Sequence, residues 1–174
     1  MQRSSEDFIK LLKPVYSNAI NYCIALTRSV IEAKDLLQDS LLKALEKFAA
    51  LKDDKKFKSW LFTILTRQYY ALHQKALIKK NLLNRFQYET AEFPQIFEKE
   101  TNEQHQKALL EALDLITEKE RVAIVLFEVG DFSMEEIRII QGDKSLSAVK
   151  SRISRTKTKL KELILGIQNT LTNR

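Results

Sequence analysis

Glycine and proline are scarce in this chain, and this scarcity constrains its fold more than any other feature of the sequence. The 174 residues include 3 Gly and 2 Pro. Strands must be joined by turns, and turns depend on these two residue types, so a fold built on sheets is disfavoured. The hydrophobic fraction of 44% is sufficient for a packed core. We therefore predict an all-α protein, which at this length forms one domain or two small ones.

Several chemistries and locations are disfavoured by the same sequence. Cys23 is the single cysteine, which excludes an internal disulfide and a multi-cysteine zinc site. The longest uninterrupted apolar run covers residues 122–127, which is too short for a membrane span. Residues 1–10 lack the apolar core of a signal peptide. We expect a cytoplasmic protein without a cofactor, a bound metal or a small-molecule substrate.

Charge is distributed unevenly along the chain. Residues 55–85 carry 8 basic and no acidic side chains, and residues 144–174 carry 8 basic and 1 acidic. Between them, residues 86–143 carry 5 basic and 14 acidic side chains. Lysine-rich helix faces are often simply solvated, but two separate basic blocks favour two surfaces that bind a polyanion.

Apolar spacing predicts four helices in the first half of the chain. One helical stretch covers about residues 6–27 and is divided near Lys13, because Pro14 cannot continue a helix without a break. Ser29 and Glu32 have the spacing of a capping box, which predicts the start of the next helix. Its predicted buried stripe consists of Leu36, Leu37, Leu41, Ala44, Leu45 and Phe48.

The opposite face of that helix is polar. Asp35, Gln38 and Asp39 lie on it, followed by Lys43. Two carboxylates four residues apart share a helix face, a spacing that suits a metal site or an acid–base pair. No third ligand or nucleophile stands beside them. The residues therefore leave three interpretations open, namely a solvated face, a docking face for a basic partner, and a catalytic pair.

Cations alternate with aromatic residues in the following helix, which Asp53 or Asp54 is predicted to cap and which extends to about Lys80. Phosphates bind cations, and unstacked bases stack on aromatic rings. A plain core would explain the aromatic residues but not the absence of acidic ones. We predict a surface for single-stranded or melted nucleic acid, formed by Lys55, Lys56, Phe57, Lys58, Trp60, Arg67 and Tyr70.

The middle of the chain reads as a linker. Residues 81–106 lose helical periodicity, turn acidic and contain Pro94. We predict that they join an N-terminal domain, residues 1–80, to a C-terminal domain, residues 107–174.

Two capping boxes, at Thr117 and Ser133, predict successive helices in the C-terminal domain. Gly130 is predicted to end the first helix. A turn that contains Gly142 follows the second, short helix, and Ser147 is predicted to cap the long basic helix after it.

This order of a short helix, a turn and a basic helix is typical of a helix-turn-helix, in which the second helix enters the major groove of DNA. An ordinary helical hairpin with a basic exposed face is the alternative. The predicted DNA-binding residues are Lys150, Ser151, Arg152, Ser154, Arg155 and Lys159.

Three segments of the sequence resemble bacterial RNA polymerase sigma factors. Residues 32–44, EAKDLLQDSLLKA, resemble the signature AEDLVQETFLKA of that family. Residues 57–64, FKSWLFTI, resemble the stretch F-x-x-WL-x-x-I that follows it. Residues 133–137 and 149–155 resemble the two helices of the family's C-terminal helix-turn-helix. The short chain, with these two domains and a linker, is similar to the extracytoplasmic-function (ECF) class.

The resemblance implies a protein that binds core RNA polymerase, through its largest subunit and flap regions, and directs promoter-specific initiation. The aromatic and basic helix would hold the melted −10 element, and the last helix would read the −35 element as duplex. An anti-sigma factor is an expected partner. The implied polymerase-docking residues are Asp35, Leu36, Gln38, Asp39 and Lys43.

Two other classes of function remain as alternatives from the sequence. One is a stand-alone helix-turn-helix regulator, which would have no need for a single-strand surface around Trp60. The other is an enzyme that acts through Asp35 and Asp39, which would need neither basic block.

Overall fold

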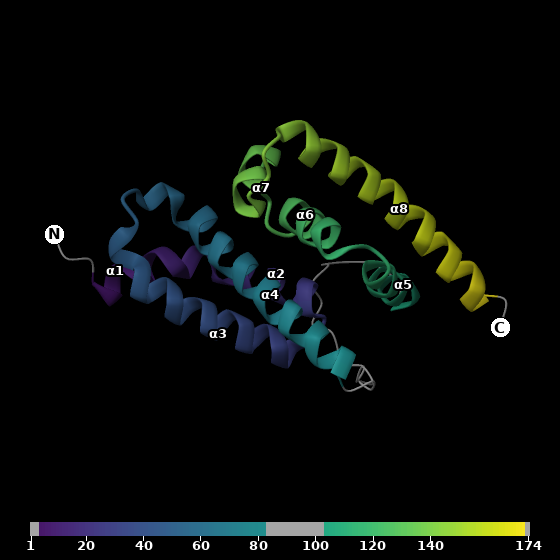
Figure 1. Ribbon diagram of the computed structural model, residues 1–174, viewed down its shortest axis with the longest axis horizontal. Helices are drawn as coiled ribbons and strands as arrows, with labels where there is room; N and C mark the ends of the chain where they lie inside the picture. The colour runs from purple at the N-terminus through teal and green to yellow at the C-terminus, as the bar shows by residue number, and fades with distance from the viewer. Residues whose placement is uncertain (1–3, 83–102, 173–174) are drawn as a thin grey trace. The chain divides into compact units, whose positions relative to one another are not determined.

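The computed structural model describes residues 4–82 and 103–172, and every regular element within these two ranges is helical (Figure 1). The all-α prediction is therefore confirmed. The chain divides into two compact units, residues 1–94 and 95–174. The helices of the first unit are α1 (Ser5–Leu12), α2 (Tyr16–Thr27), α3 (Val30–Lys47) and α4 (Phe57–Leu82). The helices of the second unit are α5 (Glu103–Asp114), α6 (Glu118–Glu128), α7 (Met134–Gln141) and α8 (Leu146–Thr172).

Helices α1 and α2 are separated at Pro14, as the sequence predicts. A short 3-10 helix, Lys13–Val15, joins them, because proline has no N–H to donate into a continuous α-helix. At the start of α1, the Ser4 hydroxyl accepts from the Asp7 N–H and the Asp7 carboxylate accepts from the Ser4 N–H. This capping box was not predicted. Helix α2 ends where Arg28 adopts the left-handed conformation, with a φ of 57°.

Side-chain caps fix the starts of the next two helices. The Ser29 hydroxyl accepts from the Glu32 N–H at 3.2 Å and begins α3 at the predicted place. Asp53, rather than the neighbouring aspartate, accepts from the Lys55 N–H at 3.0 Å. It caps the 3-10 helix Asp54–Lys56, which leads directly into α4.

An aromatic cluster holds α1, the end of α3 and the start of α4 together. The ring of Phe8 lies 5.2 Å from that of Phe48 and 5.4 Å from that of Phe57, both edge-on. The rings of Phe48 and Phe57 lie 6.2 Å apart, and Trp60 packs against both. Edge-to-face pairs add stability beyond the area that they bury. We call Phe8, Phe48, Phe57 and Trp60 the ring cluster.

A buried tyrosine links α2 to α4 deeper in the same unit. Tyr22 is fully buried, its ring lies 5.0 Å from that of Phe62, and its hydroxyl is 2.7 Å from the hydroxyl of Thr66. Thr66 in turn donates to the backbone carbonyl of Phe62. The polar atoms of this layer therefore have partners inside the core.

In the second unit, α5, α6 and α7 all pack against the long helix α8. Both predicted capping boxes are present, one formed by Thr117 and Glu120 and the other by Ser133 and Glu136. The sequence therefore located the starts of α6 and α7 correctly.

Gly130 follows the end of α6 as predicted, for a different reason from the one expected. It does not have a left-handed φ, and its N–H donates to the Val125 carbonyl at 3.1 Å. A Cβ at Gly130 would lie 2.6 Å from the Phe132 ring and 2.7 Å from the Leu126 carbonyl oxygen. Glycine is needed here because the chain turns back closely against α6.

The turn between α7 and α8 uses Gly142 in the left-handed conformation, with a φ of 68°. Helix α8 begins at Leu146, and the Ser145 hydroxyl accepts from the Ala148 N–H at 3.4 Å. The prediction that Ser147 caps this helix is therefore wrong, because Ser147 lies inside its first turn. The buried side of α8 consists of Val149, Ile153, Thr156 and Leu160.

Helices α4 and α5 extend into the two ends of the predicted linker. Residues 81–82 belong to α4, and residues 103–106 belong to α5. The remainder, residues 83–102, lies outside the described part of the chain. Among the residues that the structure describes, no helix is long and apolar enough to cross a bilayer.

Candidate functional surfaces

Helix α3 presents a polar face formed by Asp35, Gln38 and Asp39, all exposed. We call these three residues the α3 polar face. Leu36 lies between them in sequence but is only 1% exposed, so its predicted direct contact with a partner is wrong. The leucine side chain points into the core and positions the face from beneath. Lys43, further along α3, donates from Nζ to the Gln68 side-chain oxygen on α4 at 2.6 Å.

An apolar groove of about 450 Å³ lies beside the α3 polar face, and Gln38 belongs to both. Ile9 and Tyr16 contribute to it from the N-terminal helices, and Leu42 and Leu45 contribute from α3. Leu45 is 42% exposed, so its predicted place in the buried stripe is wrong. Helical spacing places Leu45 near the stripe, but its side chain lines the open groove between the N-terminal helices and α3.

The segment from Lys55 to Tyr70, which we call the start of α4, combines exposed cations with partly buried rings. Lys55, Lys56 and Arg67 are exposed, and Lys58 is half-buried. Phe57 is 2% exposed inside the ring cluster, so the prediction that it contacts nucleic acid is wrong.

Two other aromatic residues of α4 remain partly accessible. Trp60 is half-buried, with its ring 5.9 Å from that of Phe57. Tyr70 is half-buried beside Tyr69, with the ring centroids 6.0 Å apart. This surface therefore has cations with two partly exposed rings, as a site for unstacked bases requires.

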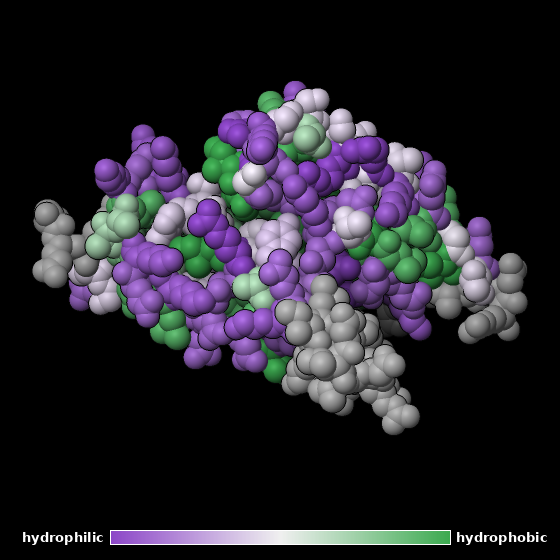
Figure 2. All heavy atoms as spheres, viewed as in Figure 1, coloured by the Kyte–Doolittle hydropathy of each residue, from purple (hydrophilic) through white to green (hydrophobic). Residues whose placement is uncertain are grey.

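Helix α8 presents Lys150, Ser151, Ser154 and Arg155 to solvent near its N-terminal end. The Arg155 Nε donates to the backbone carbonyl of Ser151 in the preceding turn, at 3.3 Å. These four predicted side chains therefore share one accessible face of the second helix of the helix-turn-helix. In Figure 2, hydrophilic side chains cover most of the visible surface, and hydrophobic ones emerge in smaller patches.

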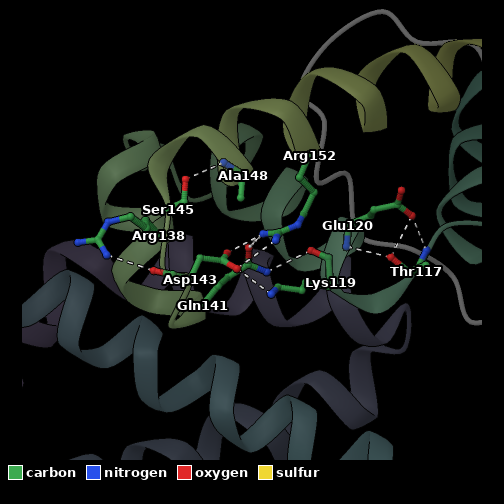
Figure 3. A network of polar contacts seen from close by, with 9 residues as sticks. All are labelled: Thr117, Lys119, Glu120, Arg138, Gln141, Asp143, Ser145, Ala148 and Arg152. Carbon is green, nitrogen blue, oxygen red and sulfur yellow. Dashed lines mark hydrogen bonds and ion pairs between the residues drawn. The ribbon is translucent and has the colours of Figure 1, made fainter.

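Arg152 is not on that accessible face, which corrects its predicted role. Its guanidinium donates to both carboxylate oxygens of Asp143, at 2.6 and 3.0 Å (Figure 3). It also donates to the Gln141 side-chain oxygen at 2.8 Å. Asp143 receives a second cation, the Lys119 Nζ, at 2.7 Å. Hydrogen bonding to Arg152 lowers the pKa of Asp143; partial burial opposes this effect and Lys119 reinforces it.

Lys159 is also engaged within the unit. Its Nζ lies 3.4 Å from Glu120 on α6, so its geometry does not support the predicted role in DNA binding. The pKa of Glu120 is lowered: burial opposes ionisation, but hydrogen bonds from Thr117 and the charge of Lys159 outweigh it. The sequence showed the basic character of both side chains but could not show that acidic partners lie on neighbouring elements.

Comparison with known proteins assigns the chain to a family. The sequence profile of Sigma-70 region 2 matches residues 9–76, a segment that contains the α3 polar face and the start of α4. RNA polymerase sigma factor SigV of Bacillus subtilis is 31% identical over 126 residues, which cover 71% of this chain and 70% of SigV. ECF RNA polymerase sigma factor EcfG of Rhodopseudomonas palustris is 29% identical over 150 residues, which cover 82% of this chain and 77% of EcfG.

The chain belongs to the ECF sigma factors. A solved structure supports the same assignment: the sigma factor RpoE of Bartonella quintana, in complex with the anti-sigma factor NepR. It matches with a TM-score of 0.79 and 29% identity, over 91% of this chain and 97% of that one. This sigma factor therefore binds RNA polymerase and acts in promoter-specific initiation. Family membership favours this function over the stand-alone regulator and the enzyme that the sequence left open.

Proposed function

We propose that this ECF sigma factor binds polymerase and promoter DNA through three separate surfaces. The α3 polar face docks on core RNA polymerase, the start of α4 holds the melted −10 element, and the exposed face of α8 reads the −35 duplex. The proposal rests on the charged residues that remain exposed after the helices have packed. Carboxylates remain accessible on α3, and cations remain accessible on α4 and α8.

The docking proposal rests on the amphipathic character of α3. Leu36 and Leu37 are buried on one side, and Asp35 and Asp39 are exposed on the other. A rigid helix with two carboxylates one turn apart suits a basic surface on the polymerase, which we expect on its largest subunit. Leu36 supports the helix, and Lys43 joins α3 to α4 through Gln68.

The two DNA surfaces use different chemistry. Lys55 and Lys56, in the 3-10 helix before α4, and Arg67 on α4 would contact phosphates, while Trp60 and Tyr70 stack on unpaired bases. On α8, the first exposed turns would enter the major groove, where side chains such as Arg155 reach base edges. The proposed domains are residues 1–80 and 107–174, joined by a linker within residues 81–106, of which residues 81–82 end α4 and residues 103–106 begin α5.

We infer that an anti-sigma factor regulates the binding of this protein to polymerase. The structural relative RpoE is in complex with such a factor, NepR. The regulator of this chain would cover the α3 polar face and a surface of the C-terminal domain in place of the polymerase. Pull-down from native cells followed by competition with core polymerase tests this mode. An inhibitor that stays bound together with polymerase would refute it.

The protein acts in the cytoplasm and contributes no covalent chemistry of its own.

Reversal of charge on the α3 polar face tests the docking proposal. Asp35→Lys with Asp39→Lys should reduce affinity for core polymerase at least about 30-fold, since charged pairs at interfaces lose roughly 2–5 kcal/mol when one partner is removed. Both side chains are exposed, so the helical content measured by circular dichroism should not change.

The matched control is Glu111→Lys with Glu162→Lys. It makes the same change in charge at two exposed positions of the C-terminal unit and should leave co-purification intact. Undiminished polymerase binding by the α3 variant would remove the docking assignment.

A further inference from the structure

A carboxylate is buried in the turn of the helix-turn-helix, where polar side chains usually face water. Asp143 follows Gly142 and is only 9% exposed. A buried carboxylate is costly unless cations and hydrogen bonds compensate it. Its contacts therefore show what holds this turn in place.

Asp143 connects three helices (Figure 3). Arg152 of α8 contacts both of its carboxylate oxygens, at 2.6 and 3.0 Å, and Lys119 of α6 contacts one at 2.7 Å. Arg138 of α7 donates to its backbone carbonyl at 3.1 Å. Gln141 joins the same group, because it accepts from Arg152 and donates to the Lys119 carbonyl at 3.1 Å.

The two-point contact between Arg152 and Asp143 fixes the rotation of α8 about its own axis. A guanidinium that donates to both oxygens of a carboxylate has a defined plane and direction, unlike a single ion pair. Successive residues of a helix are about 100° apart, so holding Arg152 inward determines which way its neighbours point. Ser151 and Arg155 are the exposed residues that this rotation presents.

We propose that Asp143 is a positioning residue for promoter recognition. Through Arg152 and Lys119 it sets the rotation of α8, and with it the base preference for the upstream promoter element. Asp143 itself does not contact DNA. The inference rests on the proposed role of α8 as the helix that reads duplex DNA.

The test uses the full chain assembled with core polymerase, and its readout is base preference. Holoenzymes with the wild-type chain or with each variant select promoters from a pool of random duplexes, and the ratio of favoured to disfavoured bases is measured at each position. Asp143→Asn keeps the shape of the side chain and removes its charge. It should lower the ratios in the upstream element by about tenfold, the scale of one bidentate base contact, and leave the downstream element unchanged.

Two reference variants distinguish a loss of positioning by Asp143 from a general effect of charge and from a loss of direct base contact. Glu111→Gln removes one carboxylate charge at an exposed position of α5 in the same unit, outside the Asp143 cluster. It should leave every ratio unchanged. Arg155→Ala removes a proposed base contact and should change the upstream ratios directly. If Arg155→Ala changes nothing, the proposed role of α8 fails; if only Asp143→Asn changes nothing, the positioning role alone fails.

Arg152→Lys gives a second route to the same conclusion, because it keeps the cation but loses the two-point contact. If Arg152 acts through Asp143, the double variant Asp143→Asn with Arg152→Lys should show the same preferences as Asp143→Asn alone. A further loss of preference in the double variant would mean that Arg152 reads DNA itself. A folded Asp143→Asn chain with wild-type ratios, and only a lower melting temperature, would overturn the proposal.

Discussion

The two units of this sigma factor are stabilised by different physical means. In the N-terminal unit, the ring cluster and the buried Tyr22 layer join helices distant in sequence, and aromatic rings provide much of the contact. In the C-terminal unit, an aliphatic core is supplemented by charged groups that packing has partly or fully covered, including Arg121 and Asp143. Arg121 is 5% exposed and donates from Nε to the Leu113 carbonyl at 2.8 Å.

This difference matters for function. Apolar packing has no strict direction, so the N-terminal unit can hold α3 and α4 rigid while their charged faces remain available to partners. Charge-assisted contacts are directional, and in the C-terminal unit they fix how α8 is presented. The same contacts remove Arg152 from the DNA surface and leave Lys159 beside Glu120. The unit therefore uses some of its cations for structure and the others for binding.

The largest expected effect comes from the ring cluster. Phe57→Ala should destabilise the N-terminal unit by about 3–5 kcal/mol, because it empties a fully packed site against Phe8 and Phe48. Trp60 is the only tryptophan of the chain, so its fluorescence follows the unfolding of this unit alone. Lys56→Ala, at the neighbouring exposed position, should change stability by less than about 0.5 kcal/mol. Equal effects of the two variants would contradict the role of the ring cluster.

A smaller effect is expected from the charged cluster. Asp143→Asn should destabilise the C-terminal unit by about 2 kcal/mol, below the cost of breaking a fully buried pair because Lys119 is about half exposed. Hydrogen exchange should show faster opening of α7 and α8, while α3 and α4 keep the wild-type rates. Faster exchange throughout the chain would mean that the two units do not respond independently.

The units should also respond to pH in opposite directions. Burial raises the pKa of Cys23 from 9.0 to about 12 and raises that of Tyr22 well above 10.0, so both remain neutral in the folded N-terminal unit. In the unfolded chain they ionise at their ordinary values, so this unit should lose stability as pH rises above about 9. Cys23→Ala should reduce that loss.

In the C-terminal unit the pKa values of Asp143 and Glu120 are lowered by their partners. Their contribution to stability is present above the ordinary carboxyl values and is lost as pH falls through the lowered ones. Denaturation followed by Trp60 fluorescence and by hydrogen exchange, over a range of pH, measures each unit separately. The comparison would be wrong if both units lost stability on the same side of neutrality.

The smallest effect concerns the start of α8. Ser145→Ala should cost about 0.5–1 kcal/mol, because its hydroxyl accepts from the Ala148 N–H at the helix terminus. Ser147→Ala, two residues later and inside the helix, should change stability by less than about 0.5 kcal/mol. Thermal unfolding of the pair decides which serine is the cap, and a larger effect at Ser147 would restore the sequence-based prediction.

Much of the fold could be predicted from local sequence signals. The capping boxes at Thr117 and Ser133 and the break at Pro14 each depend on residues close together in the chain. Such signals report hydrogen bonds and faces that a single helix determines by itself.

Most of the errors at the predicted surfaces involve contacts between elements. The cations beside Phe57 predict a DNA surface at this residue. Phe57 is instead buried in the ring cluster, which residues of α1 and the end of α3 complete. The basic character of Arg152 predicts the same kind of surface. Its guanidinium instead donates to the Asp143 carboxylate in the turn before α8. Periodicity shows which residues share a face, and it does not show which face another element covers.

The central claim is that this chain directs polymerase to promoters through two separate DNA surfaces and one docking face. Run-off transcription with sigma-free core polymerase on a promoter library tests it most directly. We predict defined transcripts from promoters that share two separated elements, and the loss of these transcripts when Asp35 and Asp39 are both changed to Lys. Absence of promoter-directed transcripts with the wild-type chain, or their persistence with the double variant, would contradict this account.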